Sequence, residues 1–299
     1  PIAGGPGSAR TGVGVSTRGL VHISQSEGHD VAALSGVDLR VAAGEIVGLL
    51  GPSGAGKSTL LTLFGGLLRP SAGAVQVDGV DLGSLDDSAL DEYRSTQVGM
   101  VLQGAGRNLL PYLTPRQNVE FAGQSAVARG RQVPDSEEVL ELVGVRSAAD
   151  LPLGRLTPGQ RQLTALAVGV ATYPGLLLAD EPTSQLDHES RDTVLAAIAQ
   201  VNATVGTTVV VVTHDPEVAS RLPRTVTIRD GRVGGEGRLG EEYAVVSADG
   251  SLALPPAALQ DLEPGTLVRV HPVNGWWTIL PADVEIEDSP LPPYRGRHE

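Results

Sequence analysis

The sequence contains no cysteine and few aromatic residues, and both absences limit what the chain can be. Without thiols it has neither a disulfide framework nor a thiolate-bound metal site. Aromatic residues are only 3% of the chain, so the core has to come mainly from leucine, valine and alanine. With 41% hydrophobic residues in 299 positions, one large domain or two can form.

Basic residues are also scarce, 22 against 35 acidic ones, and the formal net charge is −13. This balance disfavours a nucleic-acid-binding surface, which needs a basic stripe. The longest uncharged segments, 162–179 and 193–213, are interrupted by proline, glycine and amide residues. Neither supplies the roughly 20 apolar residues of a spanning helix, so we expect contact with a membrane only through a partner. Residues 1–16 are expected to be a flexible tail rather than a signal peptide.

What the sequence does contain is the phosphate-binding pattern G-x-x-x-x-G-K-[ST] between two apolar segments. Residues 46–50 predict a buried strand and residues 59–64 a helix, and such a turn aims N–H groups and the helix's positive end at one spot. Lys57 can then reach the β- and γ-phosphates, and the Ser58 hydroxyl can ligate Mg²⁺. An ordinary glycine-rich turn is the alternative, which the Lys57-Ser58 pair disfavours. The predicted phosphate-binding residues are Gly51, Pro52, Ser53, Gly54, Ala55, Gly56, Lys57, Ser58 and Thr59.

A second candidate site follows the apolar run 176–179, which predicts a central parallel strand ending in Asp180 and Glu181. The carboxyl ends of parallel strands form the edge of a sheet where ligands bind. There Asp180 can hold Mg²⁺ and Glu181 can polarise a water for attack on the γ-phosphate. Alone, an Asp-Glu pair fits a structural cap equally well.

Strands that alternate with helical segments around the phosphate loop predict an α/β fold with a parallel sheet. We expect this α/β domain to span 17–238, with a helical subdomain at about 104–172. After residue 240 the composition changes to short strand candidates, which predicts a small β-rich domain at 241–285. The Pro- and Arg-rich end, 286–299, is predicted to be disordered.

In their order along the chain, these motifs resemble the ATP-binding subunits of ABC transporters. The resemblance covers about residues 17–235 and implies a P-loop NTPase cassette with a mixed core sheet. Within the family the chain is most similar to the lipoprotein-release and macrolide-export branch. Residues 109–114 and Asn118-Val119 resemble the corresponding loop of that branch. The matching segments are Gly51–Thr59, Gln103, Leu156-Thr157-Pro158-Gly159-Gln160, Leu177–Thr183, Ser184–Asp187 and Thr213-His214-Asp215.

The resemblance implies roles for these residues. Glu181, His214 and Gln103 would be the catalytic side chains, and Ser58, Gln103 and Asp180 the ligands of Mg²⁺. The Thr157, Gly159 and Gln160 segment would cap ATP held by a second, facing subunit. Two ATP molecules would be sandwiched in a homodimer or heterodimer on the cytoplasmic face of the cell membrane, where ATP hydrolysis drives a transmembrane permease.

Two departures from the family pattern bear on the rate of hydrolysis. Pro158 replaces the usual glycine of Leu-Ser-Gly-Gly-Gln, which removes a backbone donor and fixes φ near −65°. Glu27 takes the place, by spacing, of an aromatic ring that the family usually offers to adenine. We therefore expect slow hydrolysis, and the alternative is a nucleotide-gated regulatory subunit with little turnover. A soluble ATPase of DNA repair or translation fits poorly, because the chain has one cassette and no basic surface.

The segment 249–270 resembles the swapped-hairpin dimers of AbrB-type proteins, which often bind DNA through basic residues. Here the segment is acidic, so DNA binding is disfavoured. The resemblance leaves dimer stabilisation or regulation as the role expected of residues 241–285. The acidic residues concerned are Glu241, Glu242, Asp249, Asp261 and Glu263.

Overall fold

A computed structural model of the protein describes residues 12–26, 29–238, 241–246, 250–252, 254, 258–263, 265–273 and 276–282. Its contacts divide the chain into two units, Pro1–Ala253 and Leu254–Glu299. Three sequence predictions lie outside the described residues: the role of Glu27, most of the tail 1–16, and the terminal segment 286–299.

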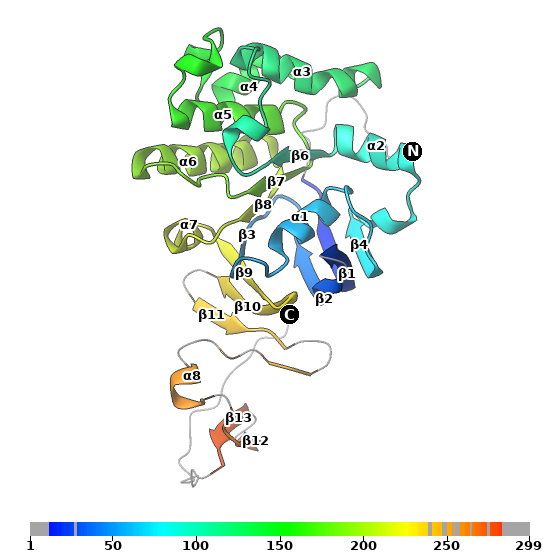
Figure 1. The fold of residues 1–299 in the computed structure, drawn as a ribbon, viewed down its shortest axis with the longest axis vertical. Helices are drawn as coiled ribbons and strands as arrows, with labels where there is room; N and C mark the ends of the chain where they lie inside the picture. The colour runs from blue at the N-terminus through cyan, green and yellow to red at the C-terminus, as the bar shows by residue number, and fades with distance from the viewer. Residues whose placement is uncertain are drawn as a thin grey trace. The chain divides into compact units, whose positions relative to one another are not determined.

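The first unit is built around a seven-stranded sheet in the order β11-β10-β9-β3-β8-β7-β6 (Figure 1). From β9 to β6 neighbouring strands run parallel, and β10 and β11 extend the sheet antiparallel beyond β9. The strands are β3 Ile46–Leu50, β6 Val98–Val101, β7 Leu176–Asp180, β8 Thr208–Val212, β9 Arg224–Arg229, β10 Arg232–Arg238 and β11 Glu241–Ala244.

Both faces of this sheet are covered, which explains why β7 and β8 are apolar without alternation. Leu176 and Leu178 of β7 pack in one hydrophobic cluster together with Phe64 of α1 (Lys57–Phe64). Leu177 and Ala179 point the other way, into the cluster that contains the apolar side chains of α5 and α6. The sheet thus separates α1 from α5 and α6, as Figure 1 shows.

A second, antiparallel sheet packs on the α1 side of the molecule in the order β2-β1-β4-β5. The expectation of a mixed sheet is confirmed for the central sheet, and this separate antiparallel sheet was not predicted. Its longest strands, β1 and β2, form an extended pair in which Leu20 and Leu34 are fully buried. The strands are β1 Val15–Ser26, β2 His29–Val41, β4 Ala72–Val77 and β5 Val80–Asp81.

A helical layer covers the opposite face of the central sheet. Its first three helices lie within residues 104–172, the range predicted as a helical subdomain. Its helices are α3 Pro115–Ala128, α4 Ser136–Leu142, α5 Pro158–Gly169 and α6 His188–Val205. The remaining helices of this unit are α2 Asp87–Thr96 and α7 Pro216–Ser220, and the second of these was not predicted. Short 3₁₀ turns lie at Leu82–Ser84, Ala105–Arg107, Arg146–Ala148 and Leu153–Arg155.

The β-rich region expected after residue 240 is divided between the two units. Strand β11 pairs with β10, so it extends the sheet of the first unit. The second unit contains α8 Ala258–Asp261 and a hairpin of β12 Val268–Val273 with β13 Trp276–Pro281. A separate domain at 241–285 with the role suggested by its resemblance stays a prediction.

Shortening Leu178 tests how far the fold depends on the centre of β7. Its side chain is 0% exposed, so Leu178→Ala removes buried methyl groups and leaves a cavity. We expect the free energy of unfolding to fall by about 2–5 kcal/mol. Leu67 is 52% exposed, and Leu67→Ala should change stability by less than about 0.5 kcal/mol. Equal effects of the two substitutions in denaturant titrations would contradict the burial described here.

Candidate functional site

The phosphate loop lies between β3 and α1, where the sequence predicted it. Gly51 and Gly56 have φ values of 140° and 96°, a region that side chains rarely adopt. Added Cβ atoms would lie 2.1 Å from the Ile228 carbonyl oxygen and 2.3 Å from that of Ala33. Nothing approaches within 4 Å of the corresponding point at Gly54, so the crest of the loop is open.

Lys57 is the first residue of α1, and its side chain folds back over the loop. The Nζ atom donates to the carbonyl oxygens of Gly51 and Pro52, both at 2.8 Å. Lys57 itself is buried, whereas the neighbouring Ser58 and the loop residue Ser53 are exposed. The loop therefore presents an ammonium group, a hydroxyl and the start of a helix at one position, which suits an anion.

The acidic residues lie at the same edge of the sheet, because β7 and β3 both pair with β8. Val212 is opposite Asp180 on one side and Leu49 on the other. Glu181 follows with a φ of 49°, and its amide donates to the Val212 carbonyl at 2.9 Å. A non-glycine residue in this conformation stores strain, which is frequent at functional sites.

Glu181 and His214 are brought into direct contact by the ends of β7 and β8. His214 Nδ1 lies 2.6 Å from Glu181 Oε1. The glutamate side chain is 11% exposed and the histidine side chain 70%, so the pair joins a mostly covered acid to a ring open to solvent. A carboxylate that orients an imidazole in this way is a common arrangement in acid–base chemistry.

Gln103 comes two residues after β6, the next parallel strand, and its side chain is exposed at the same edge. Its loop is shaped by Asn108, a residue that the sequence analysis missed. The Asn108 side chain accepts from the Leu102 amide at 2.8 Å and donates to the carbonyl oxygens of Leu102 and Gly104. An asparagine five residues after the glutamine, in a glycine-containing loop, was the available signal.

The Thr157–Gln160 segment forms the N-terminus of α5. Thr157 and Gln160 make a capping box, in which each side chain accepts a hydrogen bond from the other's backbone amide. Pro158 occupies the first helical position, where a missing N–H costs the helix nothing. Gly159 is buried, and a Cβ there would lie 2.8 Å from Ser190 Oγ, so α5 and α6 pack closely at their starts.

The structure does not bring this segment to the phosphate loop of the same chain. The helix α1 packs in the cluster on one face of the central sheet, and α5 in the cluster on the other. The segment 184–187 likewise leads into α6 on the face of α5. Asp187 caps α6 by accepting from the Ser190 amide, a hydrogen bond that lowers the pKa of Asp187.

The residues proposed to hold Mg²⁺ supply the kind of ligands that this cation prefers. Ser58, Asp180 and Gln103 offer a hydroxyl, a carboxylate and an amide oxygen at one edge of the sheet. Mg²⁺ typically takes one or two protein carboxylates and completes its shell with phosphate oxygens and water. Among the described residues, no group of three or more His, Asp or Glu side chains could hold a metal ion by itself.

Comparison with known proteins agrees with this geometry. The family model described as ABC transporter matches residues 34–184. The lipoprotein-releasing system ATP-binding protein LolD of Anaeromyxobacter dehalogenans is 43% identical over 208 residues, covering 68% of this chain and 85% of the relative. The methionine import ATP-binding protein MetN 2 of Salmonella typhimurium is 37% identical over 261 residues, covering 84% and 76%.

Solved structures show the same architecture. The dimeric ATP-binding cassette MJ0796, in a post-hydrolysis state bound to ADP and Pi, superposes with a TM-score of 0.67 at 33% identity. The match covers 75% of this chain and 98% of that one. A second structure of dimeric MJ0796 gives a TM-score of 0.66.

The fold and the phosphate loop define a P-loop ATPase. The chain belongs to the ABC transporter family, and it is an ATP-binding and ATP-hydrolysing subunit of that class. Such subunits dimerise and associate with a transmembrane permease. Among the described residues of this chain, none of the helices is long and apolar enough to cross a bilayer.

Lys57 provides a direct test of the phosphate site, because it is the only lysine in the sequence. Lys57→Met removes one charged donor, and we expect ATP affinity to fall by about 10- to 100-fold in titration calorimetry. The surface variant Arg69→Met should bind as the wild type does. ATP should also shield Lys57 from an amine-acylating reagent, as measured by peptide mass spectrometry. Unchanged affinity and labelling would exclude the site.

Pro158 can be tested against a matched proline elsewhere in the chain. Thr114-Pro115-Arg116-Gln117 forms the same capping box at the start of α3. Pro158→Gly and Pro115→Gly should each lower the free energy of unfolding by about 0.4–1 kcal/mol. Glycine gives the unfolded chain more conformational entropy than proline does, and this entropy is lost on folding.

Only Pro158→Gly should raise ATP turnover, by about tenfold, because it returns one backbone N–H donor to the first turn of α5. Steady-state ATPase assays of both variants decide this. If turnover is the same in the two variants, the proline does not limit hydrolysis.

Proposed function

We propose that two copies of this chain sandwich two ATP molecules and drive a permease for an exported or extracytoplasmic substrate. The observation that supports this is the placement of the site residues in one chain. The phosphate loop, Asp180, Glu181, Gln103 and His214 share one edge of the sheet, whereas Thr157–Gln160 lies on the far face with α5. A second copy is needed to supply the missing segment.

In this proposal the phosphate loop and Lys57 hold the β- and γ-phosphates. Glu181 orients and polarises the attacking water, and His214, in contact with Glu181, donates to the γ-phosphate. The amide of Gly159 and the hydroxyl of Thr157 in the partner chain cap the same phosphate. Mg²⁺, when bound through Ser58, Asp180 and Gln103, would neutralise charge on the phosphate oxygens.

Gln103 lies at the proposed nucleotide site, where its contacts would change with the state of the nucleotide. Its loop leaves β6 at the site and continues through Asn108 toward α3 in the helical layer. We therefore assign Gln103 a second role, the relay of nucleotide state to the permease. The permease places the chain on the cytoplasmic face of the membrane.

The branch of the family is inferred from the relatives. LolD of Anaeromyxobacter dehalogenans is named for a lipoprotein-releasing system and MetN 2 of Salmonella typhimurium for methionine import. The higher identity with LolD favours a partner of that type. The alignment with MetN 2 covers 84% of this chain and so reaches past the cassette. For residues 241–285 we keep dimer stabilisation or regulation as the proposed role.

Steady-state Mg²⁺-ATP hydrolysis by the purified chain tests this function. Glu181→Gln should strongly lower turnover while ATP binding persists, because the amide cannot polarise the water. Removal of the general base should lower kcat by about 10²- to 10⁴-fold. The control is Glu189→Gln, an exposed acid on the first turn of α6, which should leave kcat unchanged. Tight binding without turnover in the wild type, alone and with its permease, would favour a regulatory subunit instead.

A further inference from the structure

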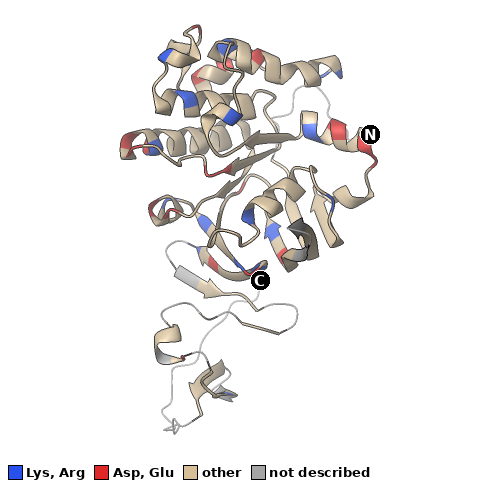
Figure 2. Ribbon diagram, viewed as in Figure 1, with Lys and Arg blue, Asp and Glu red and all other residues tan. Residues whose placement is uncertain are grey.

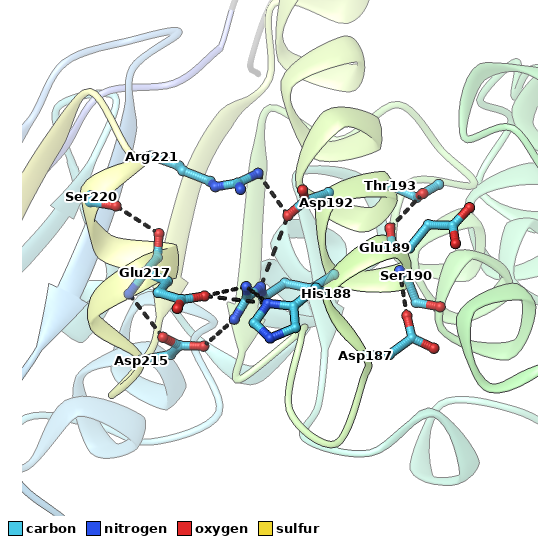
Figure 3. Close-up of polar contacts among 11 residues, drawn as sticks. Asp187, His188, Glu189, Ser190, Asp192, Thr193, Asp215, Glu217, Ser220 and Arg221 are labelled. Atoms are coloured by element: carbon cyan, nitrogen blue, oxygen red, sulfur yellow. Dashed lines mark hydrogen bonds and ion pairs between the residues drawn. The ribbon is translucent and has the colours of Figure 1, made fainter.

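Four side chains join the start of α6 to the start of α7, and we call them the Arg191 cluster. Arg191 Nη1 donates to Asp215 Oδ2 at 3.0 Å, while Nη2 contacts Glu217 Oε2 and His188 Nδ1. The Arg191 side chain is 10% exposed. Figure 2 shows acidic and basic residues together at the start of α6 and on α7, and Figure 3 shows Asp215 and Glu217 facing His188. The cluster is thus a charged bridge with a buried centre.

Each end of this bridge is attached to a different part of the site. On one side, α6 begins directly after the segment 184–187, which is proposed to line the seam between two chains. On the other side, α7 begins two residues after His214. Asp215 caps α7 by accepting from the Glu217 amide at 2.8 Å, so one carboxylate both starts that helix and pairs with Arg191.

The position of Asp215 also fixes the backbone that carries His214. Its amide donates to Thr213 Oγ1 at 3.1 Å, and the Thr213 amide donates to the Leu49 carbonyl at 3.1 Å. The His214 ring is 70% exposed, and its contact with Glu181 at 2.6 Å is the one interaction of the ring that the structure describes. A shift of Asp215 therefore moves the ring relative to Glu181.

Arginine is suited to this bridge because its two terminal nitrogens reach two carboxylates at once. A lysine has a single nitrogen and would leave Asp215 or Glu217 without its partner. The hydrogen bond from the Glu217 amide, and then the one from Arg191, lower the pKa of Asp215, so this acceptor stays ionised. Loss of the guanidinium would leave Asp215, the residue next to His214 in the chain, and Glu217 without this partner.

We propose that Arg191 is a positioning residue that couples the seam segment 184–187 to His214. Closure of two chains on the seam is transmitted through α6 and Arg191 to Asp215, which sets the contact between His214 and Glu181. This inference rests on the proposed function, since it assumes that the seam closes on ATP. The bridge contains none of the residues proposed to bind ATP, so Arg191 is expected to act on the rate of hydrolysis and not on ATP affinity.

A second ion pair joins the same helices and provides the control. Arg221 Nη1 lies 2.7 Å from Asp192 Oδ1, and the Arg221 side chain is 49% exposed. This pair fastens α6 to α7 at a point further from Asp215, and the same Asp192 oxygen lies 3.9 Å from Arg191 Nε. A role in fastening the helices predicts similar effects at Arg191 and Arg221, whereas the positioning role predicts an effect at Arg191 alone.

The experiment compares Arg191→Lys, Arg191→Gln and Arg221→Gln with the wild type in Mg²⁺-ATP hydrolysis. Both Arg191 variants should lower kcat by about 10- to 100-fold with KM for ATP within about twofold, because a small misplacement of the histidine slows the reaction. Arg221→Gln should keep the wild-type kcat. Thermal unfolding of each variant shows whether it is folded, and Arg191→Lys is the milder change if Arg191→Gln is not.

A second measurement does not depend on turnover. The imidazole NMR signal of His214, assigned with His214→Gln, should move in Arg191→Lys toward the position of a solvated histidine and stay unchanged in Arg221→Gln. An unchanged His214 signal with an unchanged kcat would overturn the proposal, as would equal losses at Arg191 and Arg221. If the wild type has no turnover, the proposed function fails, and the NMR signal still decides the role of Arg191.

Discussion

Parallel pairing of β3, β8 and β7 is the constraint on which the site depends. Because Val212 lies opposite both Leu49 and Asp180, the three strands end together, and whatever follows each of them meets at one edge. The phosphate loop follows β3, Glu181 follows β7, and His214 follows β8. A shift of one residue in this register would turn buried side chains toward the wrong face, so core packing and site geometry are fixed together.

Burial on both faces of the sheet fixes that register, and it also separates the phosphate loop from the start of α5. The apolar side chains of β7 alternate between the cluster under α1 and the cluster under α5 and α6. The same sheet that aligns the phosphate loop with Glu181 therefore holds Thr157–Gln160 away from it. The proposed sharing of sites between two chains is based on this separation, and the dimeric relatives of known structure are in keeping with it.

Several polar side chains near the site cap the N-termini of helices. Thr157, Asp187 and Asp215 each cap a helix whose first turn lies beside a proposed functional segment. Such caps satisfy amides that would otherwise be unpaired and hold the preceding loop in a defined conformation. Arg191 then links two of these capped starts, so the loops that precede α6 and α7 are not independent of each other.

Local patterns were sufficient to predict the phosphate loop, the Asp180-Glu181 strand end and the α/β class, because glycine spacing and apolar runs act over a few residues. The sequence also indicated Pro158 as a departure, but only the structure placed it at the first turn of α5, where a proline is favoured. The antiparallel sheet of β1, β2 and β4, the contact of Glu181 with His214, and the bridge from Arg191 to Asp215 were decided by tertiary structure alone. The pairing of β1 with β4, the contact of Glu181 with His214 and the bridge from Arg191 to Asp215 each join residues at least 24 positions apart. No local periodicity records which distant segments pack side by side.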